Sequence, residues 1–293
     1  MDFITQLLNG LGLGSIYALI ALGYSMVYGI VQLINFAHGD IIMVGGYAIY
    51  VVLVMAGMPL WLAVLAPLVV CGLAGMLIER LAYQRLLTHN AERISLLITA
   101  LGVSIFLQNL FMILFGSETK TMSPLFGSDS FALGGLSVTS ATLINIVVSV
   151  VMMVMLQLLV NKTKIGKAMQ ATSEDAGAAK LMGINTKRII LLTFAVGSIL
   201  AGVGAVLYIN TYQQIRPTMG NLLGLKAFVA AVLGGIGSIP GAMLGGYLLG
   251  VLEQLTKAYI TSEVTDAVVF AILIVVLLVR PAGLMGKNRK EKV

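Results

Sequence analysis

The segment INFAHGD, residues 34–40, carries the side chains with the most chemical potential in this sequence. Asn35, His38 and Asp40 place an amide, an imidazole and a carboxylate within six residues, between two apolar stretches. An aspartate at the centre of a lipid-facing helix costs about 2.5–3.5 kcal/mol. We therefore expect these side chains to face a cavity, a partner helix or water. Two interpretations remain open. They line a translocation pathway or its gate, or they form an ordinary polar turn in which Asp40 caps the next helix and Gly39 relaxes the backbone.

A second candidate is the glycine-rich sequence GGIGSIPG, which separates two apolar runs at 222–234 and 241–256. The first run would form only about 18 Å of helix, against about 30 Å for the hydrocarbon core. Irregular backbone persists at membrane depth only where protein or water satisfies its polar groups. Paired, interrupted helices of this kind indicate a transport pathway, and the alternative is a tight hairpin near the surface between full-length helices. The pathway candidates here are Gly234, Gly235, Gly237 and Pro240.

The loop 161–188 contains the signals of a short surface helix. Ser173 suits the N-cap, acidic residues follow it, and Gly183 suits the position after the helix. The pattern predicts a helix of about nine residues, Glu174–Met182, with a small apolar face. Docking into a groove of another protein explains such a face better than packing on the membrane surface does. The candidate contact residues are Glu174, Asp175, Ala178, Ala179 and Gly183.

The elements that position these segments are membrane helices. Of 293 residues, 59% are hydrophobic and 10% charged, whereas soluble domains carry about 25% charged residues. Apolar runs recur along the whole chain. We expect one all-α polytopic membrane domain, residues 1–293, with about eight or nine membrane helices including the short glycine-broken pair. The expected segments are 4–30, 40–56, 59–79, 94–115, 139–160, 189–210, 222–234, 241–256 and 266–280.

Basic residues predict the orientation of the chain. Most lysines and arginines lie in three regions, the loop at 80–93, the loop at 161–188 and the tail at 281–293. Such regions are cytoplasmic under the positive-inside bias, which also explains the net charge of +6 better than nucleic-acid binding does. The loops at 116–137 and 211–221 then face outward. This arrangement puts the N-terminus outside and the C-terminus inside.

Other features limit the function classes. The sequence has no G-x-x-x-x-G-K-[ST] loop for ATP, no Gly-x-Ser-x-Gly and no histidine cluster, so we expect no catalytic residues and no metal site. No span is expected to bury a carboxylate or an arginine array of the kind that a proton pump favours. Glu253 and Lys257 are expected to form a local ion pair near the outer interface. Gln108 and Asn109 are expected to bond between helices.

Three long motifs resemble one known family. GSIYALIALGYSMVYGIVQLINFAHGDIIMVGGY, GKAMQATSEDAGAAKLMGIN and GLKAFVAAVLGGIGSIPGAMLGGYLLG are similar, in this order, to the branched-chain amino-acid ABC transporter permeases of the LivH type. The resemblance implies an inner-membrane subunit that imports leucine, isoleucine and valine. It implies a second related permease subunit, two cytoplasmic ATP-binding subunits that hold ATP and magnesium, and a periplasmic amino-acid-binding protein, with no cofactor in this chain.

The resemblance also implies that the 174–183 segment is the coupling helix for the ATP-binding subunits. Related importers often read E-A-A-x-x-x-G there, whereas this chain reads GAAKLMG with Gly177 at the acidic position. The alternative to an importer subunit is a self-sufficient channel or facilitator for small amphipathic solutes.

Overall fold

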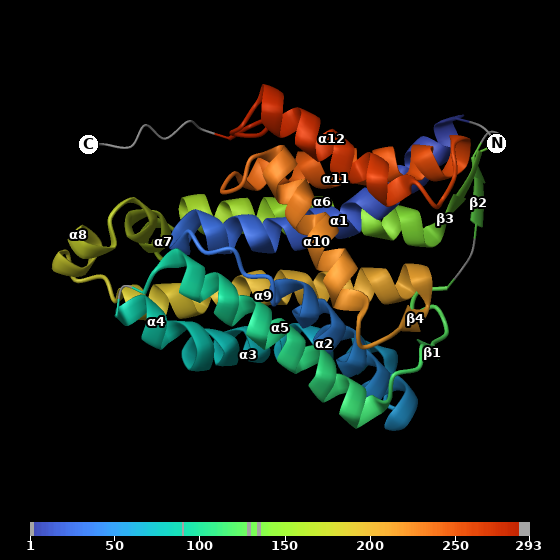
Figure 1. The fold of residues 1–293 in the computed structure, drawn as a ribbon. Helices are drawn as coiled ribbons and strands as arrows, with labels where there is room; N and C mark the ends of the chain where they lie inside the picture. The colour runs from blue at the N-terminus through green and yellow to red at the C-terminus, as the bar shows by residue number, and fades with distance from the viewer. Residues whose placement is uncertain (1–2, 90, 128–129, 134–135, 287–293) are drawn as a thin grey trace.

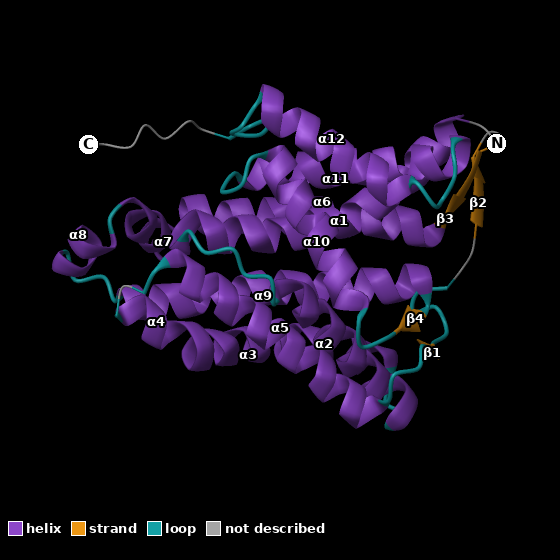
Figure 2. Cartoon of the chain, viewed as in Figure 1, coloured by secondary structure: helices purple, strands orange, loops and turns teal. Residues whose placement is uncertain are grey.

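The computed structural model describes residues 3–89, 91–127, 130–133 and 136–286. Within these residues the chain is almost entirely helical, with short strands at one end of the bundle (Figures 1 and 2). The helices are α1 Phe3–Val31, α2 His38–Tyr50, α3 Leu60–Ile78, α4 Gln84–Thr88, α5 Arg93–Phe115, α6 Ser140–Lys162, α7 Lys164–Glu174, α8 Ala176–Leu181, α9 Thr186–Tyr212, α10 Met219–Gly234, α11 Ile239–Tyr259 and α12 Thr265–Val279. Two π-helical segments, η1 Val51–Met55 and η2 Glu79–Tyr83, continue α2 and α3.

Every apolar segment expected from the sequence is a helix in the structure. Six helical stretches in the described residues are long and apolar enough to cross a membrane, so the chain is a polytopic all-α membrane protein. The expectation of a short pair holds only for its first member. α10 has 16 residues and α11 has 21, which correspond to about 24 Å and about 31 Å of helix. α11 is longer than the expected run 241–256 because it begins at Ile239 and continues through Lys257 to Tyr259.

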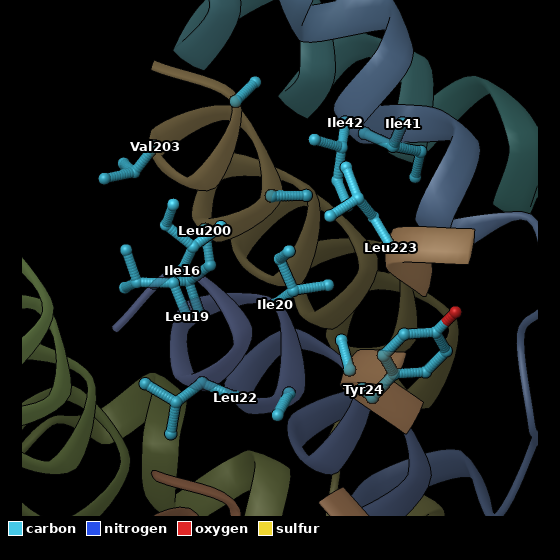
Figure 3. Packing of buried hydrophobic residues seen from close by; sticks show 14 of the residues in the cluster. Ile16, Leu19, Ile20, Leu22, Tyr24, Ile41, Ile42, Leu200, Val203 and Leu223 are labelled. Atoms are coloured by element: carbon cyan, nitrogen blue, oxygen red, sulfur yellow. The ribbon is translucent and has the colours of Figure 1, made fainter. Parts of the chain in front are cut away.

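Helix α1 occupies the centre of the bundle. Its side chains from Leu13 to Val27 are buried on all sides, as expected for a helix that is apolar all round. Ile16 and Ile20 belong to the same buried cluster as Leu200 of α9, and Figure 3 labels all three. α1 packs against α11, α9, α6 and α10, so it is a packing partner shared by four helices.

Small residues bring α1 and α11 into backbone contact. A Cβ atom added to Gly14 would lie 2.7 Å from the Cα of Tyr247, and one added to Gly250 would overlap the backbone of Gly14. Gly246 lies equally close to Ala18. Close approach of this kind drives association of helices in lipid, where the hydrophobic incentive is absent. Gly246 and Gly250 therefore belong to the packing surface between α1 and α11.

The two ends of the bundle differ in character. Strand β1 Lys120–Thr121 pairs antiparallel with β4 Gln214–Ile215, which joins the two loops expected on one side of the membrane. A second hairpin, β2 Ser130–Leu133 with β3 Leu136–Thr139, lies at the same end (Figure 2). The opposite end carries α4, α7 and α8, and α12 runs toward it (Figure 1).

The expectation that no span buries a carboxylate is wrong. Asp40 and Glu253 are each 1% exposed. The ion pair expected between Lys257 and Glu253 is present at 2.6 Å, with the Glu253 side chain buried and the Lys257 side chain 36% exposed. Burial is possible because partners far away in the sequence neutralise or hydrogen-bond each carboxylate, and the spacing of residues along one helix does not reveal them.

Candidate functional site

A cavity of about 1360 Å³ opens at the end of the bundle that carries α7. We call it the α7-side cavity. Its walls come from the end of α1, the end of α6, α7, the turn between α10 and α11, and the segment after α12. Both apolar and polar groups line it, among them Tyr28, Ile236, Gln157, Lys167 and Glu174. The volume is ample for a small amphipathic molecule.

The glycine-rich turn between α10 and α11 forms one wall of this cavity. Gly237 and Pro240 line it directly. Gly235 and Gly237 have φ angles of +105° and +90°, which side chains rarely adopt and glycine adopts freely. Gly234 packs backbone to backbone on Gly241. The turn therefore requires glycine for both its conformation and its packing.

Side chains and backbone from other helices satisfy the polar groups of this turn. Ser25 of α1 accepts a hydrogen bond from the Gly237 N–H at 2.9 Å and donates to the Ser238 carbonyl at 3.3 Å. Ser238 caps α11 by accepting from the Gly241 N–H at 3.2 Å. Irregular backbone is tolerated in a membrane protein under this condition.

The segment after α12, residues 280–286, closes the end of α10. The N–H groups of Leu284 and Met285 donate to the carbonyls of Leu233 and Gly234, each at 2.9 Å. The last carbonyls of a helix have no partner within the helix, so these bonds complete α10. Pro281 and Met285 also line the α7-side cavity. The C-terminal part of the chain is therefore built into the candidate site.

Asn35, His38 and Asp40 lie together in the interior and do not line the α7-side cavity. Asn35 Oδ1 accepts hydrogen bonds from the Tyr83 hydroxyl at 2.8 Å and from the Ala37 N–H at 3.1 Å. Asp40 Oδ1 accepts from Gln108 Nε2 of α5 at 3.0 Å. The expected interhelical role of Gln108 is thus confirmed. Asn109 instead bonds to the Ile105 carbonyl of its own helix.

The ordinary-turn interpretation of this segment is wrong in both of its details. Asp40 does not cap α2, because the N-cap is Ala37 without a side-chain bond. Gly39 permits close contact rather than an unusual backbone conformation, since a Cβ there would lie 2.7 Å from the Cα of Gly224 in α10. Buried polar atoms such as His38 Nε2 have no hydrogen-bond partner among the described residues. Such atoms are uncommon in stable cores and mark places that rearrange or bind.

The 161–188 loop forms two helices, not one. The expected helix Glu174–Met182 is interrupted at Asp175, which ends α7 and caps α8 by accepting from the Ala178 N–H at 2.9 Å. Ser173 is inside α7 and does not cap α8. Gly183 has a φ angle of +84°, as expected for the residue that follows a helix. Asp175, two residues after Ser173, takes the N-cap position of α8, and this explains the difference.

The apolar face of α8 differs from the expected one. Ala179 is 4% exposed and faces its own chain, whereas Leu181 and Met182 are 90% and 84% exposed. Glu174 lines the α7-side cavity. The two large exposed side chains at the tip of the loop are therefore the outward-facing apolar groups.

Sequence reasoning missed several residues that the structure brings into these sites. Ser25 gave no signal, because a serine in an apolar helix is common. Lys226 did carry a usable signal. It is a lone charge within the apolar run at 222–234, and such residues are functional candidates by default.

Comparison with known proteins identifies the family. The family described as branched-chain amino acid transport system / permease component matches residues 6–277. The chain is 44% identical to the high-affinity branched-chain amino acid transport system permease protein LivH of Escherichia coli (strain K12), over 99% of this chain and 98% of that protein. It is likewise 44% identical to BraD of Pseudomonas aeruginosa over 99% and 98%, and 30% identical to the probable LivH of Methanocaldococcus jannaschii over 94% and 90%. The chain therefore belongs to the family of branched-chain amino-acid transport permeases, as a multi-pass inner-membrane component.

Proposed function

We propose that this chain is a translocation subunit of an ATP-driven importer for leucine, isoleucine and valine. The observation that carries the proposal is the full-length match to LivH and BraD, whose names specify high-affinity branched-chain amino acid transport. The α7-side cavity supports it, because a mixed lining suits a solute with an aliphatic side chain and a charged backbone end. Gly237 and Pro240 line its wall, and we assign Gly234 and Gly235 to the backbone contacts that hold this turn of the pathway in place.

Asn35, His38 and Asp40 are assigned to the part of the pathway beyond this cavity. Their unsatisfied polar atoms and their contacts with α5 and α10 support a place where the bundle closes. A gate built from buried polar groups opens at lower cost when water or solute satisfies those groups.

The orientation follows from the distribution of charge. The basic loops and the end of α12 share one end of the bundle (Figure 1), and the positive-inside bias assigns that end to the cytoplasm. The N-terminus then lies outside, the C-terminus lies inside, and residues 1–293 form one permease domain. α10 and α12 complete eight or nine crossings together with the longer helices.

The energy for transport comes from partner subunits. This chain has no phosphate-binding loop for ATP, and ATP and magnesium are bound by two cytoplasmic ATP-binding subunits. We assign α8 as the contact, with Leu181 and Met182 as apolar anchors and Asp175, Ala178 and Gly183 as the residues that shape the helix. A second related permease subunit and a periplasmic amino-acid-binding protein complete the importer. Closure of the ATP-binding subunits would shift the bundle between its open states.

Reconstitution of the chain with these partners tests the proposal. The complex should take up leucine, isoleucine and valine in proteoliposomes only when ATP is present on the α8 side. Leu181→Asp should lower ATP-dependent uptake and co-purification of the ATP-binding subunits, while Lys180→Gln, a neighbouring polar change, should leave both near the wild-type level. Uptake by the purified chain alone would instead favour the facilitator interpretation.

A further inference from the structure

A cluster of four charged residues joins α10, α11 and α12 inside the bundle. Glu253 Oε1 accepts hydrogen bonds from Lys226 Nζ at 3.0 Å and from Lys257 Nζ at 2.6 Å. Glu253 Oε2 accepts from the Tyr17 hydroxyl of α1 at 2.8 Å. Lys226 also pairs with Asp266 Oδ1 of α12 at 2.7 Å. The cluster has two ammonium and two carboxylate groups and is formally neutral.

Stability alone does not account for this cluster. Removing two charges from water costs several kcal/mol per ion, and a buried pair often stabilises no more than apolar residues of the same size. Ionisable residues inside a membrane domain are rare and usually serve function. The cluster is therefore expected to permit or prevent a movement of these helices.

Lys226 lies at the point of α10 where the packing partner of this helix changes. After Lys226, α10 lies against α11, where a Cβ on Gly245 would lie 2.7 Å from the Gly234 nitrogen. Before Lys226, α10 leaves α11 and packs on α2, where Gly220 and Gly224 contact Gly39. The Lys226 side chain thus reaches back to α11 at the point where the two helices separate.

The arrangement of partners allows Lys226 to leave Glu253 without stranding a buried charge. Glu253 would keep Lys257, four residues along its own helix, and the Tyr17 hydroxyl. Lys226 would keep Asp266, whose side chain is 48% exposed. α12 is fastened to α10 at its other end as well, through the bonds from Leu284 and Met285. The first half of α10 can therefore shift relative to α11 while Lys226 stays paired with Asp266.

We propose that Lys226 is the positioning residue of an ion-pair clasp, which ties the middle of α10 to Glu253 of α11, fixes the first half of α10 in its place on α2, and opens during each transport cycle. The clasp rests on the proposed transport function and specifies how the helix that ends in the cavity wall is controlled. Breaking the Lys226–Glu253 pair frees the part of α10 that contacts Gly39, next to Asp40. A change at the clasp thereby reaches both candidate pathway regions.

Two lysines that bond the same oxygen provide a matched pair of variants. Lys226→Met removes the link between α10 and α11, whereas Lys257→Met removes a bond within α11 and leaves that link in place. Spin labels at Asn221→Cys and Ala258→Cys report the separation of the two helices. Cys71 is the single native cysteine and is buried, so Cys71→Ala gives a clean background.

The clasp predicts one dominant label distance in the resting wild-type complex and in Lys257→Met. Lys226→Met should add a population at longer distance, and Lys226→Arg should restore the single distance. Leucine uptake should fall about tenfold in Lys226→Met, within the usual range of coupling between sites, while ATP hydrolysis without the binding protein should rise. Equal distances and equal uptake in Lys226→Met and Lys257→Met would overturn the proposal.

A second variant covers the case in which Lys226→Met does not assemble. Asp266→Asn keeps the Lys226–Glu253 pair but removes the partner that Lys226 retains on release. This variant should keep the label distance of the resting complex and should take up leucine more slowly. Normal uptake by Asp266→Asn would contradict the claim that Asp266 holds Lys226 after it leaves Glu253. A wild-type complex that transports no amino acid would refute the proposed function instead, while the label distances would still test the clasp.

Discussion

Gly235→Ala is expected to destabilise the protein more than the same change two residues later. Gly235 has a φ angle of +105°, and an alanine held there stores about 1–3 kcal/mol of strain. Its Cβ would also lie 2.8 Å from the Cα of Gly286. The 280–286 segment would then have to move and release its two hydrogen bonds to α10, each contributing about 0.5–1.5 kcal/mol. The combined loss is about 2–6 kcal/mol.

Gly237→Ala separates strain from contact. Gly237 has a φ angle of +90°, but a Cβ there would lie 3.6 Å from its nearest neighbour, the Cα of Gly29. Only the strain of about 1–3 kcal/mol is expected. Gly102→Ala is the reference, because Gly102 lies in the middle of α5 with nothing within 4 Å of an added Cβ. It should be neutral or stabilise the helix by up to about 1 kcal/mol.

Unfolding of the purified variants in detergent measures this ranking, and uptake by the reconstituted complex shows its effect on transport. Gly235→Ala should have the lowest unfolding midpoint and the lowest uptake. The reasoning fails if Gly235→Ala and Gly237→Ala are equally stable, because the contact with the 280–286 segment would then contribute nothing.

Three further changes test other contacts. Gly250→Val should cost about 1–3 kcal/mol by forcing α11 away from Gly14; an unchanged midpoint in thermal unfolding would show that the two helices can part freely. Gln108→Leu should lower the free energy of unfolding by about 1–3 kcal/mol because Asp40 loses the hydrogen bond from Gln108. Asn109→Leu should unfold like the wild type, because the amide of Asn109 bonds within α5. A larger loss of stability in Asn109→Leu than in Gln108→Leu would contradict the interhelical role of Gln108. Asp175→Ala should remove the cap of α8, worth about 1 kcal/mol, and lower substrate-stimulated ATP hydrolysis without shifting global unfolding; unchanged hydrolysis would mean that the shape of α8 does not matter for coupling.

Much of the architecture could be predicted because each membrane helix can be recognised from the apolar residues of its own segment. Runs of apolar residues must be helical in lipid, since every backbone group needs a partner within its own segment. Each of the nine expected segments is a helix for this reason.

The candidate sites were less accessible to the same reasoning. A helix capped by Ser173 would turn Ala179 toward a partner protein. The cap is Asp175 instead, and Ala179 is buried against its own chain. Helical spacing reveals Lys257 as a partner of Glu253 but does not reveal that Glu253 is buried. Its partners Tyr17 and Lys226 come from other helices.

The sequence by itself determined that the chain is a membrane bundle, where its helices run, and which loops share an end, because these properties depend on local composition. Only the tertiary structure decided that Asp40 meets Gln108, that residues 280–286 complete α10, and that Lys226 links three helices. Those contacts depend on how each helix is rotated and how closely glycines let neighbours approach. Rotation and approach are set by the packing of the whole bundle, so no single segment encodes them.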